Sequence, residues 1–323
     1  MESVNFFTYP SARQGMEISA RIYHPQASPR GIIQLVHGMC EYVARYDETI
    51  NFLCGQGYIV CGNDHLGHGD TARINHEQQG WFGGWDSTRM LVKDVHRLTV
   101  YMRQQYPELP LIMVCHSMGS FIGRLCIGLF PKDYDGAVVL GTAGPRAAAE
   151  LGRNMAMLVG QFRGDRYISK AINQMVTRNN LSGLERALTP FDWISRDRKV
   201  VDAYIADPDC NFIFTVSAFK DLFTLMKECN NPAWYKAVPR NFPMLLASGD
   251  HDPVGDFGNG VRRVYRGLDA AGCDKVEMIL YTGARHELHN ELCREDFLKD
   301  MAAWIERVLS DRADGKGEQA HGA

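Results

Sequence analysis

Residues 111–120 read Leu-Ile-Met-Val-Cys-His-Ser-Met-Gly-Ser and carry the strongest structural signal in the chain. The apolar residues at the start of this stretch predict a buried strand, and a helix is expected to begin at Met118. Ser117 therefore falls in a sharp strand-to-helix turn, a nucleophile elbow, which holds the serine Oγ above the sheet edge. Gly119 is one of the small residues that such a turn needs, whereas Cys115 stands where glycine is usual.

A second apolar run, 32–36, ends at His37 and Gly38. By itself a His-Gly pair is an ordinary strand end, but its position before the elbow suits an oxyanion loop. The backbone N–H groups of Met39 and Met118 are then expected to point into one space and to stabilise a developing negative oxygen. One such donor typically lowers the barrier by ~3 kcal/mol.

Two late strands, 242–248 and 275–281, run into loops that contain Asp252 and His286. A serine hydroxyl is a weak nucleophile at neutral pH, so it needs an imidazole to accept its proton. The imidazole in turn needs a carboxylate to orient it and to stabilise its charge. The chain order Ser, Asp, His matches one of the known triad orders. We therefore predict that Ser117, Asp252 and His286 are catalytic.

Asp250 and His289 are competing candidates for the same two roles. Asp250 lies nearer its strand, and His289 falls at the start of the last helix. Catalytic side chains are usually presented by loop tips beyond strand ends, which favours Asp252 and His286.

Strands and helices alternate along most of the chain. Residues 16–22 alternate apolar and polar, as in a half-exposed antiparallel strand, and a helical apolar stripe runs through 86–106. Continuous apolar runs, typical of parallel strands covered on both faces, occur at 32–36, 58–61, 111–115, 137–141 and 243–247. The pattern predicts an α/β fold with a doubly wound, mostly parallel sheet and the candidate residues at its carboxyl edge.

The alternation stops between residues 144 and 240, where the sequence predicts a mainly helical cap inserted between a first core part, 1–143, and a second, 241–310. Residues 311–323 have no apolar anchor and are expected to be disordered. Some apolar groups of the cap are expected to line an acyl-chain groove and the others to pack it on the core: Met155, Met157, Leu158, Phe162, Phe191, Trp193, Phe212, Phe214, Phe219, Phe223 and Met226.

Composition narrows the class of protein. The 323 residues carry a formal net charge of -3, which argues against nucleic acid and anionic membranes as main partners. The sequence contains no apolar run of ~18 residues and signals neither export nor membrane spanning, so we expect a cytoplasmic protein without stable membrane insertion. Nine cysteines without a Cys-x-x-Cys pair indicate reduced thiols.

Three motifs together resemble the monoacylglycerol lipase and lysophospholipase branch of the α/β-hydrolases. They are the segment 37–42 (His-Gly-Met-Cys-Glu-Tyr), the loop 64–69 (Asp-His-Leu-Gly-His-Gly) and the elbow itself. The chain departs from the branch at Tyr42, where the family has histidine, and at Cys115, where it has glycine. Neither departure removes a catalytic atom.

The resemblance implies an α/β-hydrolase fold, the same Ser-Asp-His triad and the same two oxyanion donors. It also implies supporting or substrate-binding roles for His37, Gly38, Glu41 and His116.

A zinc site is the rival interpretation of the second motif, since imidazoles and carboxylates that lie close together bind metal. The candidate ligands are Asp64, His65, His68 and Asp70. No pattern of further ligands accompanies them, so we expect no metal and no other cofactor.

The sequence thus predicts a serine hydrolase that cleaves monoacylglycerols, lysophospholipids or similar small acyl esters through an acyl-enzyme. The cap is a candidate for transient contact with lipid surfaces. Amide cleavage, as by a proline-type aminopeptidase, thioester cleavage and a non-catalytic binding role stay open as alternatives. The sequence leaves the oligomeric state open.

Overall fold

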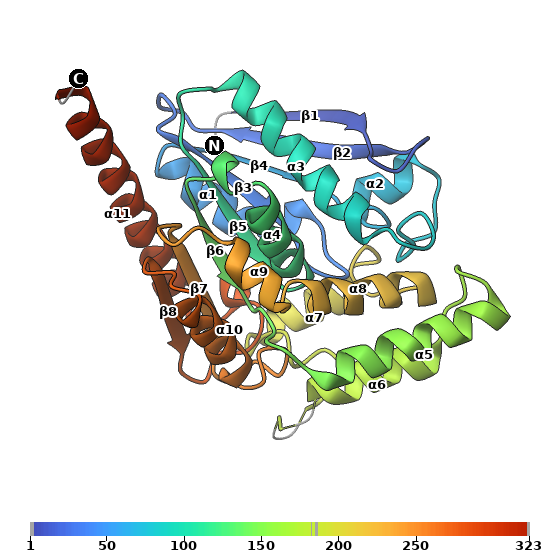
Figure 1. Cartoon of the computed structure of the whole chain (residues 1–323). Helices are drawn as coiled ribbons and strands as arrows, with labels where there is room; N and C mark the ends of the chain where they lie inside the picture. Colours follow the sequence, from blue (N-terminus) through green and yellow to red (C-terminus); the bar gives the residue numbers. More distant parts are fainter. Residues whose placement is uncertain (1–2, 182, 185–186, 322–323) are drawn as a thin grey trace.

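The computed structural model describes residues 3–181, 183–184 and 187–321. In this part of the chain, an eight-stranded sheet has the order β1-β2-β4-β3-β5-β6-β7-β8 (Figure 1). β2 runs antiparallel to β1 and β4, and the other pairs are parallel. This confirms the predicted α/β-hydrolase fold. The strands are β1 Ser3–Pro10, β2 Glu17–His24, β3 Gly31–Val36, β4 Tyr58–Asn63, β5 Leu111–His116, β6 Gly136–Leu140, β7 Met244–Gly249 and β8 Val276–Tyr281.

Two apolar layers sandwich the sheet, as a doubly wound fold requires. One layer joins one sheet face to α3 (Thr88–Gln105), α4 (Met118–Leu129), α8 (Val216–Glu228) and α10 (Asn259–Ala270). The other layer joins the opposite face to α1 (Asp47–Gly55) and α11 (Arg294–His321). The predicted stripe on α3 is fully buried: Leu91, Val95, Leu98 and Met102. The core helices are α1 Asp47–Gly55, α2 Gly69–Ile74, α3 Thr88–Gln105, α4 Met118–Leu129, α10 Asn259–Ala270 and α11 Arg294–His321, with short 3₁₀ turns η1 Val43–Tyr46, η2 Pro131–Asp133 and η3 Leu288–Asn290.

Two details of the first strands differ from expectation. The edge strand β1 was not predicted, because its residues are mostly exposed and its apolar pattern is weak. β2 is buried on both faces rather than half exposed, since α2 covers the face that was expected to be open. There the Ser19 N–H donates to Thr71 Oγ1 at 2.9 Å.

In the described part of the segment between β6 and β7 there are five helices: α5 Ala147–Arg163, α6 Lys170–Leu181, α7 Arg198–Ala206, α8 Val216–Glu228 and α9 Pro232–Ala237. α5 and α6 lie side by side, away from the sheet (Figure 1). α8 contacts α5 on one side and α3 and α4 on the other, so it joins this insertion to the core. The division into core and cap domains at 144 and 240 stays a prediction.

The last helix ends within the tail for which the sequence predicts disorder, and the disorder of residues 311–323 stays a prediction. α11 continues as a helix to His321, and residues 322–323 lie outside the described residues. Two ion pairs attach the start of this extension to the core, Lys275 with Asp311 at 3.2 Å and Arg312 with Asp135 at 2.8 Å.

Candidate active site

Ser117 lies between the end of β5 and the start of α4 and adopts a strained backbone conformation, with φ 54° and ψ −121°. Positive φ is uncommon for a residue with a side chain and persists only where the surroundings impose it. Here the Ser117 N–H donates to the Leu140 carbonyl at 3.0 Å, which ties the turn to β6. The turn directs the serine into a cavity, as the elbow prediction requires.

Close packing of the backbone explains why small residues surround the elbow. A Cβ on Gly119 would lie 2.1 Å from the Val36 carbonyl oxygen, so only glycine lets α4 pass β3 at this distance. Cys115, the departure from the family pattern, is fully buried. Its side chain fits because Gly123 faces it, where a Cβ would lie 2.7 Å from the Cys115 sulfur. The missing glycine of the motif is therefore replaced by one on the following helix.

The predicted oxyanion loop packs directly on the elbow. A Cβ on Gly38 would lie 2.9 Å from the Ser117 Cβ and 2.5 Å from Glu41 Oε1. Met39 and Met118 line the same cavity as the serine. The Met39 N–H has no hydrogen-bond partner among the described residues, and the Met118 N–H belongs to the first turn of α4, where no intrahelical partner exists. Both N–H groups are thus available to a ligand.

Asp252 and His286, from the loops after β7 and β8, are brought together. The His286 Nδ1 lies 3.0 Å from Asp252 Oδ2, and both side chains are buried. Burial would raise the pKa of Asp252, but the adjacent imidazole and hydrogen bonds from Val254 N–H and the Ser248 hydroxyl hold it below its usual value. The carboxylate is therefore ionised at neutral pH and orients the ring.

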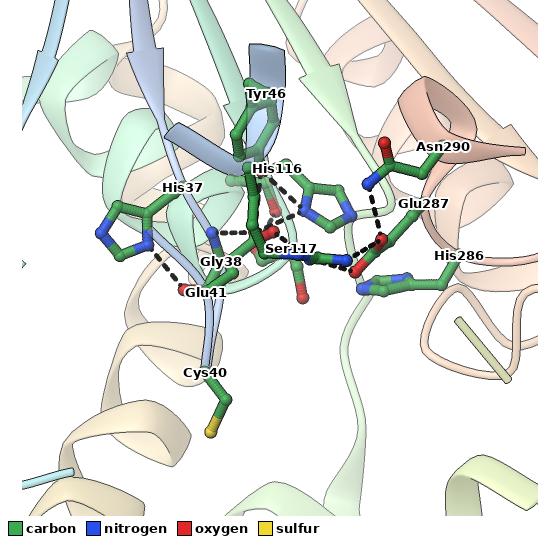
Figure 2. Close-up of polar contacts among 12 residues, drawn as sticks. His37, Gly38, Cys40, Glu41, Tyr46, His116, Ser117, His286, Glu287 and Asn290 are labelled. Carbon is green, nitrogen blue, oxygen red and sulfur yellow. Dashed lines mark hydrogen bonds and ion pairs between the residues drawn. The ribbon is translucent and has the colours of Figure 1, made fainter. Parts of the chain in front are cut away.

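The other ring nitrogen of His286 faces the serine side of the site (Figure 2). This Nε2 is buried and has no hydrogen-bond partner in the described part of the chain. Among the described residues, this nitrogen makes no hydrogen bond to the serine hydroxyl. Gly141, which the sequence reasoning missed, makes room for the ring, since a Cβ there would lie 2.9 Å from His286 Cε1.

The two competing residues are engaged elsewhere. Asp250 accepts hydrogen bonds from the Gly283 N–H at 2.6 Å and from His251 Nδ1 at 2.7 Å. His289 stacks on the Tyr46 ring with centroids 4.3 Å apart. Neither residue replaces Asp252 or His286 in the contact described above.

A buried cluster of charges lies beneath the elbow (Figure 2). Glu41 Oε1 accepts hydrogen bonds from Gly38 N–H, from the Tyr46 hydroxyl at 2.8 Å and from His116 Nδ1 at 2.9 Å. Burial opposes ionisation of Glu41, but His116 and Arg45 hold its pKa well below the usual range. Burial likewise opposes protonation of His116, yet Glu41 raises its pKa. The supporting residues Gly38, Glu41 and His116 thus form one network, to which the structure adds Tyr46 and Arg45.

The histidines of the loop 64–69 support the oxyanion loop through neutral imidazoles. The His65 N–H donates to His37 Nε2 at 2.9 Å, and the Cys40 N–H donates to His68 Nε2 at 3.2 Å. Burial lowers the pKa of all three histidines, to about 3 for His68. Each acceptor nitrogen therefore stays unprotonated at neutral pH.

The contacts that the loop's two carboxylates make do not support the zinc interpretation. Asp64 accepts from the Val43 and Asp70 N–H groups, both at 2.9 Å, and the Asp70 carboxylate pairs with Arg21 and Arg73. Within the described residues, the one group of side chains with ligand atoms close enough for a metal is a different one, made by Glu41, His116 and His289.

A cavity of about 460 Å³ opens onto Ser117, Met39 and Met118. Five of the predicted cap groups line it: Phe191, Trp193, Phe212, Phe223 and Met226. The other predicted groups are not among the lining residues, and Leu158 and Phe162 are exposed instead. Polar residues of α6, not anticipated from the sequence, also line the cavity: Asn173, Gln174, Thr177 and Asn180. The cavity therefore suits an amphiphilic ligand with a large apolar part.

The fold and the site define an α/β-hydrolase with a nucleophile elbow. The family model described as serine aminopeptidase S33 (Hydrolase_4) matches residues 27–293, so the chain belongs to this family. No helix among the described residues is long and apolar enough to cross a membrane.

Relatives and solved structures agree with this assignment. The chain is 24% identical to mouse monoglyceride lipase over 302 residues, covering 92% of this chain and 89% of the relative. It is 26% identical to monoacylglycerol lipase of Mycolicibacterium smegmatis over 297 residues, covering 90% and 93%. A thermostable carboxyl esterase from Bacillus coagulans, solved with glycerol, superposes with a TM-score of 0.89 at 29% identity, covering 96% of this chain and all of that one.

Proposed function

We propose that the protein is a serine hydrolase that cleaves monoacylglycerols, lysophospholipids or similar small acyl esters. The observation that carries the proposal is the placement of a strained elbow serine, two available backbone N–H groups and a carboxylate-held imidazole around one largely apolar cavity. The monoglyceride lipases and the carboxyl esterase among the similar proteins support the ester substrate class.

The chemistry follows from the roles of these groups. His286 Nε2 accepts the Ser117 proton as the serine oxygen attacks the ester carbonyl, and the N–H groups of Met39 and Met118 stabilise the oxyanion. The imidazolium then gives its proton to the departing alcohol and leaves an acyl-serine. Water, deprotonated by the same imidazole, releases the carboxylic acid by the reverse sequence, while Asp252 stabilises the charged ring.

Replacement of the nucleophile tests the proposal. We expect Ser117→Ala to abolish both p-nitrophenyl ester hydrolysis and labelling by a fluorophosphonate, without loss of the folded state. Ser217→Ala, at a buried serine in α8, is the matched control and should keep both. A Ser117→Ala enzyme with wild-type ester turnover, assayed after circular dichroism has verified its fold, would refute the assignment.

The leaving group needs its own test, because the same triad also cleaves amides and thioesters. A panel of one acyl chain presented as glyceryl ester, ethyl ester, thioester and anilide compares these reactions directly. We expect kcat/KM to be highest for the glyceryl ester. A preference for an amide would favour the aminopeptidase alternative, and absence of any turnover or labelling would favour a binding protein.

We also propose that the cap makes transient contact with lipid aggregates. Three apolar side chains on α5, Leu151, Leu158 and Phe162, are 66%, 57% and 80% exposed, and their spacing puts them near one helix face. Phe162→Glu should weaken co-sedimentation with phosphatidylcholine vesicles, and equal sedimentation of the variant and the wild type would exclude this surface.

We further propose a cytoplasmic location, which suits the nine free cysteines of the chain.

A further inference from the structure

An ion-pair chain that no motif predicts connects the oxyanion loop to the loop of the candidate base. Arg45, in η1, donates to Glu287 through both terminal nitrogens, at 2.9 and 3.1 Å, and to Glu41 Oε2 at 3.2 Å. Glu41 also accepts from the Gly38 N–H, and Glu287 is the immediate neighbour of His286. Two segments that are 242 residues apart in the sequence are thereby held against each other (Figure 2).

Each end of this chain is fixed by further bonds. The Asn290 amide donates to Glu287 Oε2 at 2.8 Å, and the Glu287 N–H donates to the Ile194 carbonyl at 2.8 Å. The Arg45 guanidinium lies over the Tyr204 ring, 4.9 Å from its centroid. The ion pair therefore has one defined geometry rather than many.

The charges are almost removed from water, with side-chain exposures of 11% for Arg45, 2% for Glu41 and 5% for Glu287. Burying such charges costs free energy that their attraction scarcely recovers, and apolar side chains of similar size often stabilise a fold equally well. Neither Arg45 nor Glu287 is among the residues that line the cavity. Stability and substrate contact thus explain this arrangement poorly, whereas fixing the register of two loops explains it well.

We propose that Arg45 and Glu287 are positioning residues, which hold His286 in register with the oxyanion loop and the nucleophile. The inference rests on the proposed function. We therefore expect loss of the pair to slow the chemical step and to leave ground-state substrate binding unchanged. The reason is that a displacement of about 1 Å at a reacting group, here the His286 imidazole, costs about 100-fold in rate.

The first experiment neutralises one end of the pair. Glu287→Gln should lower kcat by about 10- to 100-fold with little change in KM, and the rate of fluorophosphonate labelling should fall in the same ratio. Glu287→Asp, which keeps the charge, should recover part of the loss. Asp135→Asn weakens the ion pairs of Asp135 with Arg103 and Arg312, both at 2.8 Å, just before the amino-terminal end of β6 and away from the catalytic strand ends. This control should lower thermal stability and leave kcat unchanged.

The second experiment separates positioning from stability. In the double variant Arg45→Met/Glu287→Leu, apolar groups replace the pair, so we expect thermal stability close to wild type together with the same loss of kcat. Wild-type kcat in the folded double variant, or in Glu287→Gln, overturns the inference even if Ser117→Ala is inactive. An active Ser117→Ala enzyme would instead overturn the proposed function, so the two failures are distinguishable.

Discussion

At the scale of single residues, the choice between two nearby carboxylates depends on a contact of 3.0 Å between Asp252 and His286. Asp250, two positions away, hydrogen-bonds to the Gly283 N–H and is one-third exposed. We therefore expect Asp252→Asn to lower kcat by about 10⁴-fold, since an amide holds the wrong imidazole tautomer. Asp250→Asn should change kcat far less. Steady-state kinetics of the two variants measure this difference, and equal losses would contradict our assignment of the orienting carboxylate.

Several residues of the candidate site could be proposed from the sequence because they belong to local motifs at strand ends: Ser117, His37, Gly38, His116 and Glu41. The strand-to-helix turn and the glycine positions are visible in a few consecutive letters of sequence. Arg45, Glu287 and Gly141 were not predictable, because an arginine, a glutamate or a strand-end glycine has no distinctive local pattern. Their roles depend on neighbours contributed by distant segments.

At the scale of elements, the close approach of β3 and α4 sets the position of the nucleophile. Because a Cβ on Gly119 would meet the Val36 carbonyl oxygen at 2.1 Å, Gly119→Ala must push the helix away from the strand. We expect a loss of about 3 kcal/mol in the free energy of unfolding. Gly55→Ala, at the end of α1, is the matched control, because the added methyl group meets no atom within 4 Å. Urea denaturation of both variants tests this, and similar midpoints would show that α4 can shift at little cost.

At the scale of the whole molecule, buried neutral histidines make stability depend on pH. Burial lowers the pKa of His68 and of His289 from the ordinary 6.5 to about 3. The unfolded chain binds protons at these positions below pH 6.5 and the folded chain does not, so this stability is complete above pH 6.5 and is lost as the pH falls toward 3. At pH 5 each of these two histidines therefore lowers the free energy of unfolding by about 2 kcal/mol. His116, whose pKa is raised, opposes this trend.

His289 offers a direct measurement of this dependence, because neither of its ring nitrogens has a hydrogen-bond partner among the described residues. His289→Phe keeps the stack on Tyr46 and removes the titration. The variant should lose about 2 kcal/mol less stability than the wild type between pH 7.5 and pH 5, as measured by urea denaturation at both values. Parallel losses in the two proteins would show that His289 does not titrate in this range.

The amino-acid sequence alone predicts the alternation of strands and helices, the doubly wound sheet and the strand ends at which chemistry is presented. Hydrophobic periodicity and turn residues encode these features within short windows of the chain. The folded chain was needed to show which carboxylate meets which imidazole, which cap side chains face the cavity, and that Arg45 bridges Glu41 and Glu287. Such contacts join loops that are far apart in the chain, and their geometry follows from how the finished core packs rather than from any local pattern.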